Sequence, residues 1–202
     1  RPLATGQLSL RAAVLLLIAL IALAFALVLL LNPLTIKLAL IAACLAILYP
    51  FTKRFTHWPQ LILGIAFSWS IPMAFAATRQ QIPAIAWYLL IANVLWTISY
   101  DTEYAMSDRN EDLKIGIKST AILFGRYDRL IIGLMQLAML GILIYIGLLL
   151  RISWPFYLSI GIAATLFISH QKSIQQRDPK ACFQAFLKNS WVGLVIFLGI
   201  LL

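Results

Sequence analysis

The sequence predicts an all-α membrane protein with seven transmembrane helices. Of its 202 residues, 62% are hydrophobic and only 11% are charged, and the mean hydropathy is +0.93. These values exclude an ordinary soluble domain. The apolar runs are long enough, at 17 to 21 residues, to cross a bilayer core of about 30 Å. Lys and Arg concentrate in alternate segments between these runs, as the cytoplasmic loops of membrane proteins do.

The predicted spans follow one another closely along a single polytopic membrane domain, residues 1–202. The first contains 20 uncharged residues, too many for the apolar core of a secretory signal. Asn32 and Pro33 predict a tight break before the second span, and Pro72 predicts a kink within the third. The seven spans are 12–31, 34–51, 59–77, 82–100, 130–150, 152–169 and 186–202.

The positive charges predict the orientation of the chain. Thirteen of the sixteen Lys and Arg residues, Arg1 among them, fall on one side of the predicted bundle, and only Lys37, Arg79 and Arg151 fall on the other. The segment between the fourth and fifth spans is therefore expected on the cytoplasmic side of a bacterial inner membrane. A mitochondrial inner membrane, with the same segment in the matrix, is the alternative. The net charge of +9 thus indicates topology, and we expect no nucleic-acid partner.

Five of the seven acidic residues lie within twelve positions, between the fourth and fifth spans. They are Asp101, Glu103, Asp108, Glu111 and Asp112. On a helix, Asp101, Asp108 and Asp112 would lie within roughly 40° of one another. Asp108 and Asp112 would repel each other one turn apart, and a cation would turn that repulsion into attraction. Because Mg²⁺ commonly joins one or two carboxylates to substrate phosphates, these three aspartates are candidate metal ligands.

The same residues would also suit a solvated acidic loop between two membrane helices. Two features favour a binding site instead. The aspartates repeat on one helical face, and Arg109, Lys114 and Lys118 around them suit a polyanionic phosphate.

The second span ends in the segment YPFTKR, residues 49–54, with two adjacent cations. One interpretation is a diphosphate-binding site, in which the Arg54 guanidinium makes bidentate hydrogen bonds to phosphate oxygens and the Lys53 ammonium lies beside it. The other is an ordinary anchor of the positive-inside kind. A magnesium site on the same side of the membrane would favour the diphosphate-binding site.

Together these segments resemble a known family. YDTEYAMSDRNED (100–112), followed by KIGIKSTAILFG (114–125), is similar to the second Asp-rich motif of the UbiA superfamily of intramembrane aromatic prenyltransferases. Within that superfamily, these two segments are most similar to the sequences of the branch that prenylates 4-hydroxybenzoate in ubiquinone biosynthesis. RPLATG (1–6), YPFTKR (49–54) and GIAFSWSIP (64–72) also match, so the resemblance covers essentially the whole chain.

The resemblance implies a nine-helix bundle around a central cavity, of which this chain would supply seven helices. The first two helices, and the N-D-x-x-D type motif that completes the Mg²⁺ site, are expected upstream of Arg1, which would make this chain a partial enzyme. The implied reaction transfers a polyprenyl group from polyprenyl diphosphate to the ring of 4-hydroxybenzoate at the lipid bilayer.

The resemblance also implies roles for individual residues. Magnesium would be held by Asp101, Asp108 and Asp112, and the catalytic residues would be Asp108, Asp112 and Arg54. The diphosphate would be bound by Lys53, Arg54, Lys114 and Lys118. Tyr49 and Tyr104 would shield the allylic cation.

Three other hypotheses fit part of the sequence. The first is a menaquinone or haem branch of the same superfamily. The second is a seven-helix cation carrier, although a carrier should place ionisable residues near the membrane midplane and these lie at one rim. A non-catalytic assembly protein is the third.

Overall fold

The computed structural model describes residue 3 and residues 5–202, and this part contains helices and turns but no strand. Arg1, and with it part of the RPLATG segment, lies outside the described residues. The elements are α1 (Leu10–Leu29), α2 (Pro33–Phe55), α3 (Pro59–Ser68), α4 (Ser70–Arg79), α5 (Ala84–Lys114), α6 (Thr120–Phe124), η1 (Gly125–Tyr127), α7 (Asp128–Leu150), α8 (Trp154–Ser173), η2 (Ile174–Gln176) and α9 (Pro179–Leu201).

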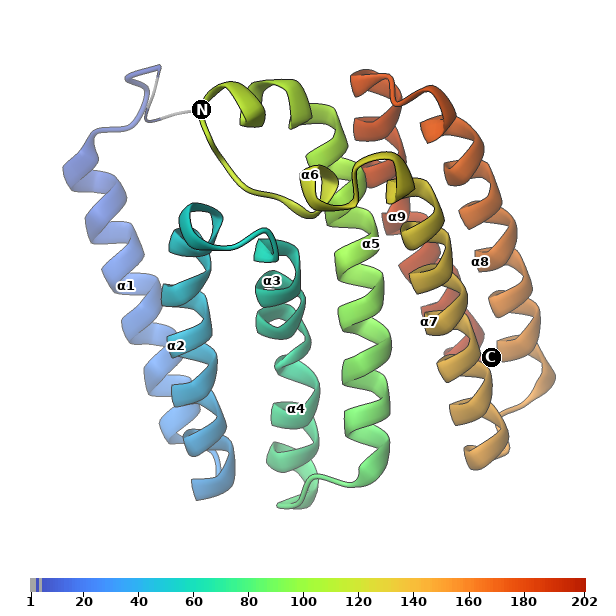
Figure 1. The fold of residues 1–202 in the computed structure, drawn as a ribbon. Helices are drawn as coiled ribbons and strands as arrows, with labels where there is room; N and C mark the ends of the chain where they lie inside the picture. Colours follow the sequence, from blue (N-terminus) through green and yellow to red (C-terminus); the bar gives the residue numbers. More distant parts are fainter. Residues whose placement is uncertain (1–2, 4) are drawn as a thin grey trace.

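The long helices stand side by side, with α1 and α2 at one edge, α5 in the middle and α7, α8 and α9 at the other side (Figure 1). Six helical stretches are long and apolar enough to cross a membrane, counting α3 with α4 and α6 with α7. Helix α8 is less apolar and is not among these six, but it is the seventh long helix. Its 20 residues span about 30 Å, and it packs along α7 and α9. The predicted all-α fold with seven long helices is confirmed.

The third predicted span is interrupted near Pro72, as expected. Helix α3 ends at Ser68 and α4 begins at Ser70. Proline has no backbone N–H, so the Ser68 carbonyl four residues earlier loses its helical partner. The Trp69 side chain at the break is fixed by its indole N–H, which donates to the Leu38 carbonyl of α2 at 3.0 Å.

Helix α5 extends well past the predicted end of the fourth span. It continues to Lys114, 31 residues in all, or about 46 Å, whereas the membrane core is about 30 Å thick. Between residues 84 and 114 there is no Gly or Pro. The helix ends just before Gly116, which has a φ of 70°. The acidic segment is therefore helical, and a loop interpretation of it was wrong.

Most of the core lies among α5, α7, α8 and α9, whereas α1 contributes no buried residue and packs on α2. Helix α9 contacts α5 closely at Gly193, where an added Cβ would lie 2.8 Å from Trp96 Cη2. The Trp96 ring is held in place because its indole N–H donates to Asn189 Oδ1 at 3.0 Å. Glycine is therefore required at this contact.

We expect Gly193→Ala to destabilise the bundle by about 1–3 kcal/mol, because the methyl group meets a ring that is anchored. The matched control is Gly161→Ala in α8, where nothing lies within 4 Å of the added Cβ; alanine there should be neutral or stabilising through its helix propensity. Thermal unfolding in detergent measures both. Equal melting temperatures for the two variants would contradict a close α5–α9 contact.

Candidate active site

Helix α5 carries all five clustered acids, and they have different surroundings. Asp101, Asp108 and Asp112 are half-buried, Glu111 is exposed and Glu103 is fully buried. The three half-buried aspartates keep the common face that the sequence predicts, because the helix is continuous through them.

Asp101 lies where α2, α3 and α5 meet. Its carboxylate is hydrogen-bonded by the Gln60 side chain of α3 and lies close enough to Lys53 of α2 for an electrostatic interaction. Gln60 is 2% exposed, and its Oε1 accepts from the Thr120 N–H at 3.0 Å, which leaves its amide N–H groups for Asp101. Sequence reasoning missed Gln60; the available signal was an amide in the first turn of an otherwise apolar helix.

Lys53 is the cation that the structure brings to the carboxylates. It is half-buried in the last turn of α2 and interacts electrostatically with Asp112 as well as with Asp101. Its backbone carbonyl accepts from the Lys118 N–H at 3.1 Å. This bond ties the end of α2 to the segment that follows α5, so Lys53 stays beside the acidic face.

Aromatic rings line the neighbouring surface. Tyr49, one turn before Lys53 on α2, lies close to Asp101, Tyr100 and Tyr104. The Tyr104 ring packs against Phe186 of α9, with 5.1 Å between ring centroids. The predicted cation-shielding residues Tyr49 and Tyr104 are thus brought together beside Asp101.

Four other basic residues that were predicted to bind phosphate do not lie beside the aspartates as Lys53 does. Arg54 and Lys114 are exposed, and no ion pair within the described residues joins either to an acid. The Lys118 ammonium donates to the Phe55 carbonyl at 3.3 Å, at the end of α2. Arg109 is turned about 100° around the helix from Asp108, and its guanidinium forms an ion pair with Asp128 instead.

The three aspartates do not gather around one point. Across the described part of the chain, no group of three His, Cys, Asp or Glu side chains could hold a metal ion. The reason is the helical rise of 1.5 Å per residue, which puts Asp101 and Asp112 roughly 16 Å apart along the axis. Asp108 and Asp112, one turn apart and electrostatically coupled, fit the arrangement in which two carboxylates join magnesium to substrate phosphates. A single three-aspartate metal site stays a prediction, and the separation of Asp101 from the other two aspartates along α5 does not favour it.

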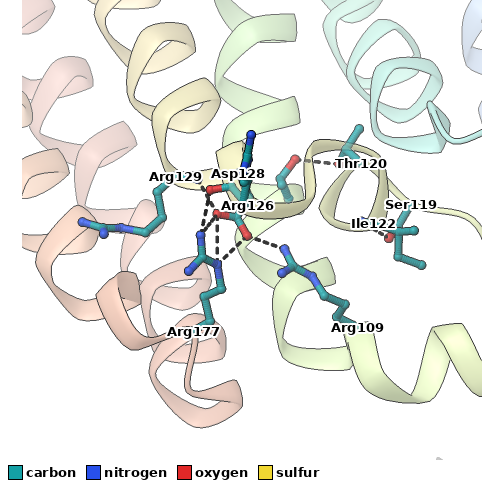
Figure 2. Close-up of polar contacts among 9 residues, drawn as sticks. Arg109, Ser119, Thr120, Ile122, Arg126, Asp128, Arg129 and Arg177 are labelled. Carbon is teal, nitrogen blue, oxygen red and sulfur yellow. Dashed lines mark hydrogen bonds and ion pairs between the residues drawn. The ribbon is translucent and has the colours of Figure 1, made fainter.

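Asp128, which the sequence analysis did not single out, fixes the end of α5 to the rest of the bundle (Figure 2). It is fully buried and accepts from the guanidinium groups of Arg109 and Arg177 and from the Arg129 N–H, the last at 2.7 Å. The Asp128 carboxylate in turn raises the pKa of Arg177. This cluster joins α5, α7 and the turn after η2.

Glu103 is buried inside the bundle and has a structural role there. It is 0% exposed and accepts from Asn189 Nδ2 at 2.8 Å and Gln136 Nε2 at 3.4 Å. Asn189 also accepts from the Trp96 indole. Glu103 therefore joins α5 to α7 and α9 by hydrogen bonds inside the bundle.

These features define a class of protein: a helical membrane bundle that gathers carboxylates, a lysine and aromatic rings at one end. Comparison with known proteins makes the class specific. The model of the UbiA prenyltransferase family matches residues 1–198. The chain belongs to the UbiA prenyltransferase family.

Two curated relatives cover nearly the whole chain. The 4-hydroxybenzoate octaprenyltransferase of Enterobacter sp. (strain 638) is 56% identical over 200 residues, which is 99% of this chain and 69% of the relative. The protein of the same name from Yersinia pseudotuberculosis serotype O:3 (strain YPIII) is 55% identical over 202 residues, 100% of this chain and 70% of the relative.

Solved structures share the fold. The apo structure of a UbiA homolog from Aeropyrum pernix K1 superposes with a TM-score of 0.85 at 27% identity, covering 100% of this chain and 75% of that one. A structure of digeranylgeranylglyceryl phosphate synthase has a TM-score of 0.74 at 18% identity over 99% of this chain and 72% of that one, a likeness of fold alone.

We expect Asp128→Asn to destabilise the protein by on the order of 3 kcal/mol, because it leaves two arginines without their buried partner. Glu111→Gln removes an exposed acid of the same helix and should change stability little. Thermal unfolding of both variants in one detergent tests this expectation. If they unfold at the same temperature, Asp128 does not hold α5 in place.

Proposed function

We propose that this chain transfers a polyprenyl group from polyprenyl diphosphate to the ring of 4-hydroxybenzoate. The observation that carries the proposal is identity of 55–56% over essentially the whole chain with proteins named 4-hydroxybenzoate octaprenyltransferase. Those names favour this branch over the menaquinone and haem branches. Membership of a prenyltransferase family argues against the cation carrier and the assembly protein.

The site supports the first step, in which the allylic C–O bond breaks and the diphosphate leaves with both electrons. Lys53, half-buried and close to Asp101 of α5, would stabilise negative charge as it develops on the diphosphate oxygens. Asp101, which is hydrogen-bonded by Gln60, would position Lys53. Arg54 lies on the exposed side of the same turn, where it would contact the outer phosphate.

Asp108 and Asp112 are the residues that would hold magnesium. When bound, the ion supplies positive charge that makes the diphosphate a better leaving group. Asp101 lies two turns from Asp108 and is hydrogen-bonded by Gln60. We therefore assign it to positioning Lys53 rather than to the metal, which revises the role implied by the resemblance.

The second step forms the new carbon–carbon bond. The allylic cation must be kept from water until the ring carbon ortho to the phenol hydroxyl attacks it and loses its proton. Tyr49 and Tyr104 present aromatic rings beside Asp101, where their faces would stabilise a cation. The packing of Tyr104 on Phe186 fixes one of these rings.

The roles of the three aspartates can be separated experimentally. In washed membranes with 4-hydroxybenzoate, we expect Asp108→Asn and Asp112→Asn to raise the magnesium concentration needed for half-maximal activity by at least about tenfold, as the loss of a ligand does. Asp101→Asn should raise the KM for the diphosphate and leave the magnesium requirement unchanged. Unchanged activity in the first two variants would argue against the proposed site; a magnesium shift in Asp101→Asn would restore it as a ligand.

Lys53→Ala should lower kcat/KM for polyprenyl diphosphate about ten- to a hundredfold, because hydrogen bonds to charged groups are worth about 1.5–3 kcal/mol. The KM for 4-hydroxybenzoate should change little. Arg79→Ala, at the exposed end of α4 on the other side of the bundle, is the control and should retain activity. If the acceptor KM rises and the donor KM does not, Lys53 does not bind the diphosphate.

A further inference from the structure

A crevice runs between α7 and α8, away from the carboxylates. Its walls are apolar, with Leu137 and Leu140 on α7 facing Ala164 and Phe167 on α8, and its volume is about 310 Å³. It opens at the end nearest η1 into a wider hollow of about 490 Å³. Both share Arg129, Gly133, Leu137 and Gln171. Arg126 and Arg177 also line the hollow, so three arginines lie at this end of the apolar crevice.

Gly133 helps to keep this crevice open. A Cβ at this position would lie 3.5 Å from the Gln171 side chain across the gap, so any larger side chain would project into the space between the helices. Gln171 Nε2 donates to Gln136 Oε1 at 3.3 Å, and Gln136 Nε2 donates to Glu103. Because the two amides are bonded to each other and to Glu103, the wall of the crevice suits an apolar occupant.

In the described part of the chain, two of the three arginines at its end, Arg126 and Arg129, are not in an ion pair with an acid, whereas Arg177 is paired with Asp128. Within residues 5–202, Asp128 is the only acid in an ion pair, and its partners are Arg109 and Arg177. Figure 2 shows Arg129 pointing away from Asp128, whereas Arg109 and Arg177 point toward it. Arg129 Nη2 donates to the Gln171 carbonyl at 3.3 Å, but its Nε is buried and lacks a hydrogen-bond partner in the described structure. Arg126, stacked on the Tyr127 ring at 4.7 Å, provides a second cation.

We propose that this crevice binds an anionic phospholipid, with its phosphate at Arg126 and Arg129 and an acyl chain between α7 and α8. The neighbouring Leu130 and Leu134 are 60% and 56% exposed, as expected for a surface covered by lipid. The arginines lie at the end of the bundle that the Lys and Arg count places on the cytoplasmic side, where anionic lipids attract basic residues. Among the described residues that line the crevice and the hollow there is no acid, so a zwitterionic headgroup would find no acidic side chain in the lining for its ammonium group.

The polyprenyl diphosphate donor is also an amphipathic anion, but its proposed site is elsewhere. Lys53 and Asp101 lie on α2 and α5, and neither they nor Asp108 or Asp112 line the crevice. The crevice is therefore a second, independent site that a membrane lipid would occupy while the enzyme works.

The test uses the protein purified in detergent and supplied with phosphatidylglycerol or phosphatidylcholine at equal mole fraction. Native mass spectrometry counts the retained lipids, and thermal unfolding measures stability. We expect retained phosphatidylglycerol to raise the melting temperature, whereas phosphatidylcholine should not. Arg126→Gln and Arg129→Gln should each weaken phosphatidylglycerol binding about fivefold, corresponding to the roughly 1 kcal/mol that one Lys or Arg contributes near an anionic surface.

Two further variants make the result decisive. Gly133→Leu fills the crevice but keeps every charge, and should also lose phosphatidylglycerol. Arg151→Gln, at the other end of α7, should bind it as the unaltered protein does. Equal retention of both lipids, or retention of phosphatidylglycerol by Gly133→Leu, would overturn the proposal. So would displacement of phosphatidylglycerol by polyprenyl diphosphate at the crevice, since that would assign the crevice to the donor.

Discussion

The position of α5 is the constraint on which the site depends. Backbone polar groups in a membrane must be satisfied within the helix, so α5 has to cross the bilayer without a break. It then continues for several turns as the same helix. One rigid element therefore carries both the apolar span and the carboxylates, and any rotation of α5 moves Asp101, Asp108 and Asp112 together. The positions of these side chains therefore depend on how firmly the rest of the bundle fixes the position and rotation of α5.

Three sets of polar contacts hold α5. Glu103 accepts from side chains of α7 and α9 inside the bundle. In the same turn of α5, the hydroxyls of Thr102 and Thr120 lie 2.7 Å apart, and Gln60 is hydrogen-bonded to both Thr120 and Asp101. Closest to the end, Arg109 is paired with Asp128. In a lipid environment these groups have few other hydrogen-bond partners, and an unsatisfied polar group costs several kcal/mol. The contacts therefore favour one orientation of α5.

Much of the fold was predictable from the sequence because the membrane imposes it. Uncharged runs of about 20 residues mark the helices, and Pro72 marks the interruption in the third. The helix ends were less predictable: α2, α5 and α9 all continue through polar residues at one side. Hydropathy locates the bilayer boundary, whereas a helix ends where the backbone requires it, as at Gly116.

The candidate site was predictable in part for the same reason. One helical face was enough to relate Asp108 to Asp112, but it took no account of how far Asp101 lies from them along the helix axis. Gln60 was missed because its role depends on a contact with α5 and α6 across the bundle. Arg109 was assigned to phosphate because its partner, Asp128, is 19 residues away in the sequence.

The Lys and Arg residues at this end of the bundle differ in the groups that they contact. Counted together, they predict the orientation of the chain in the membrane. Individually, the position of each cation around its helix decides which groups it contacts. Lys53 faces the aspartates of α5, Arg109 and Arg177 face a buried carboxylate, and Arg126 and Arg129 line the hollow at the end of the crevice between α7 and α8. Because these charges point in different directions, the same basic end of the bundle can hold the fold together through Arg109 and Arg177 and leave Lys53, Arg126 and Arg129 for the anionic substrate and lipid that we propose.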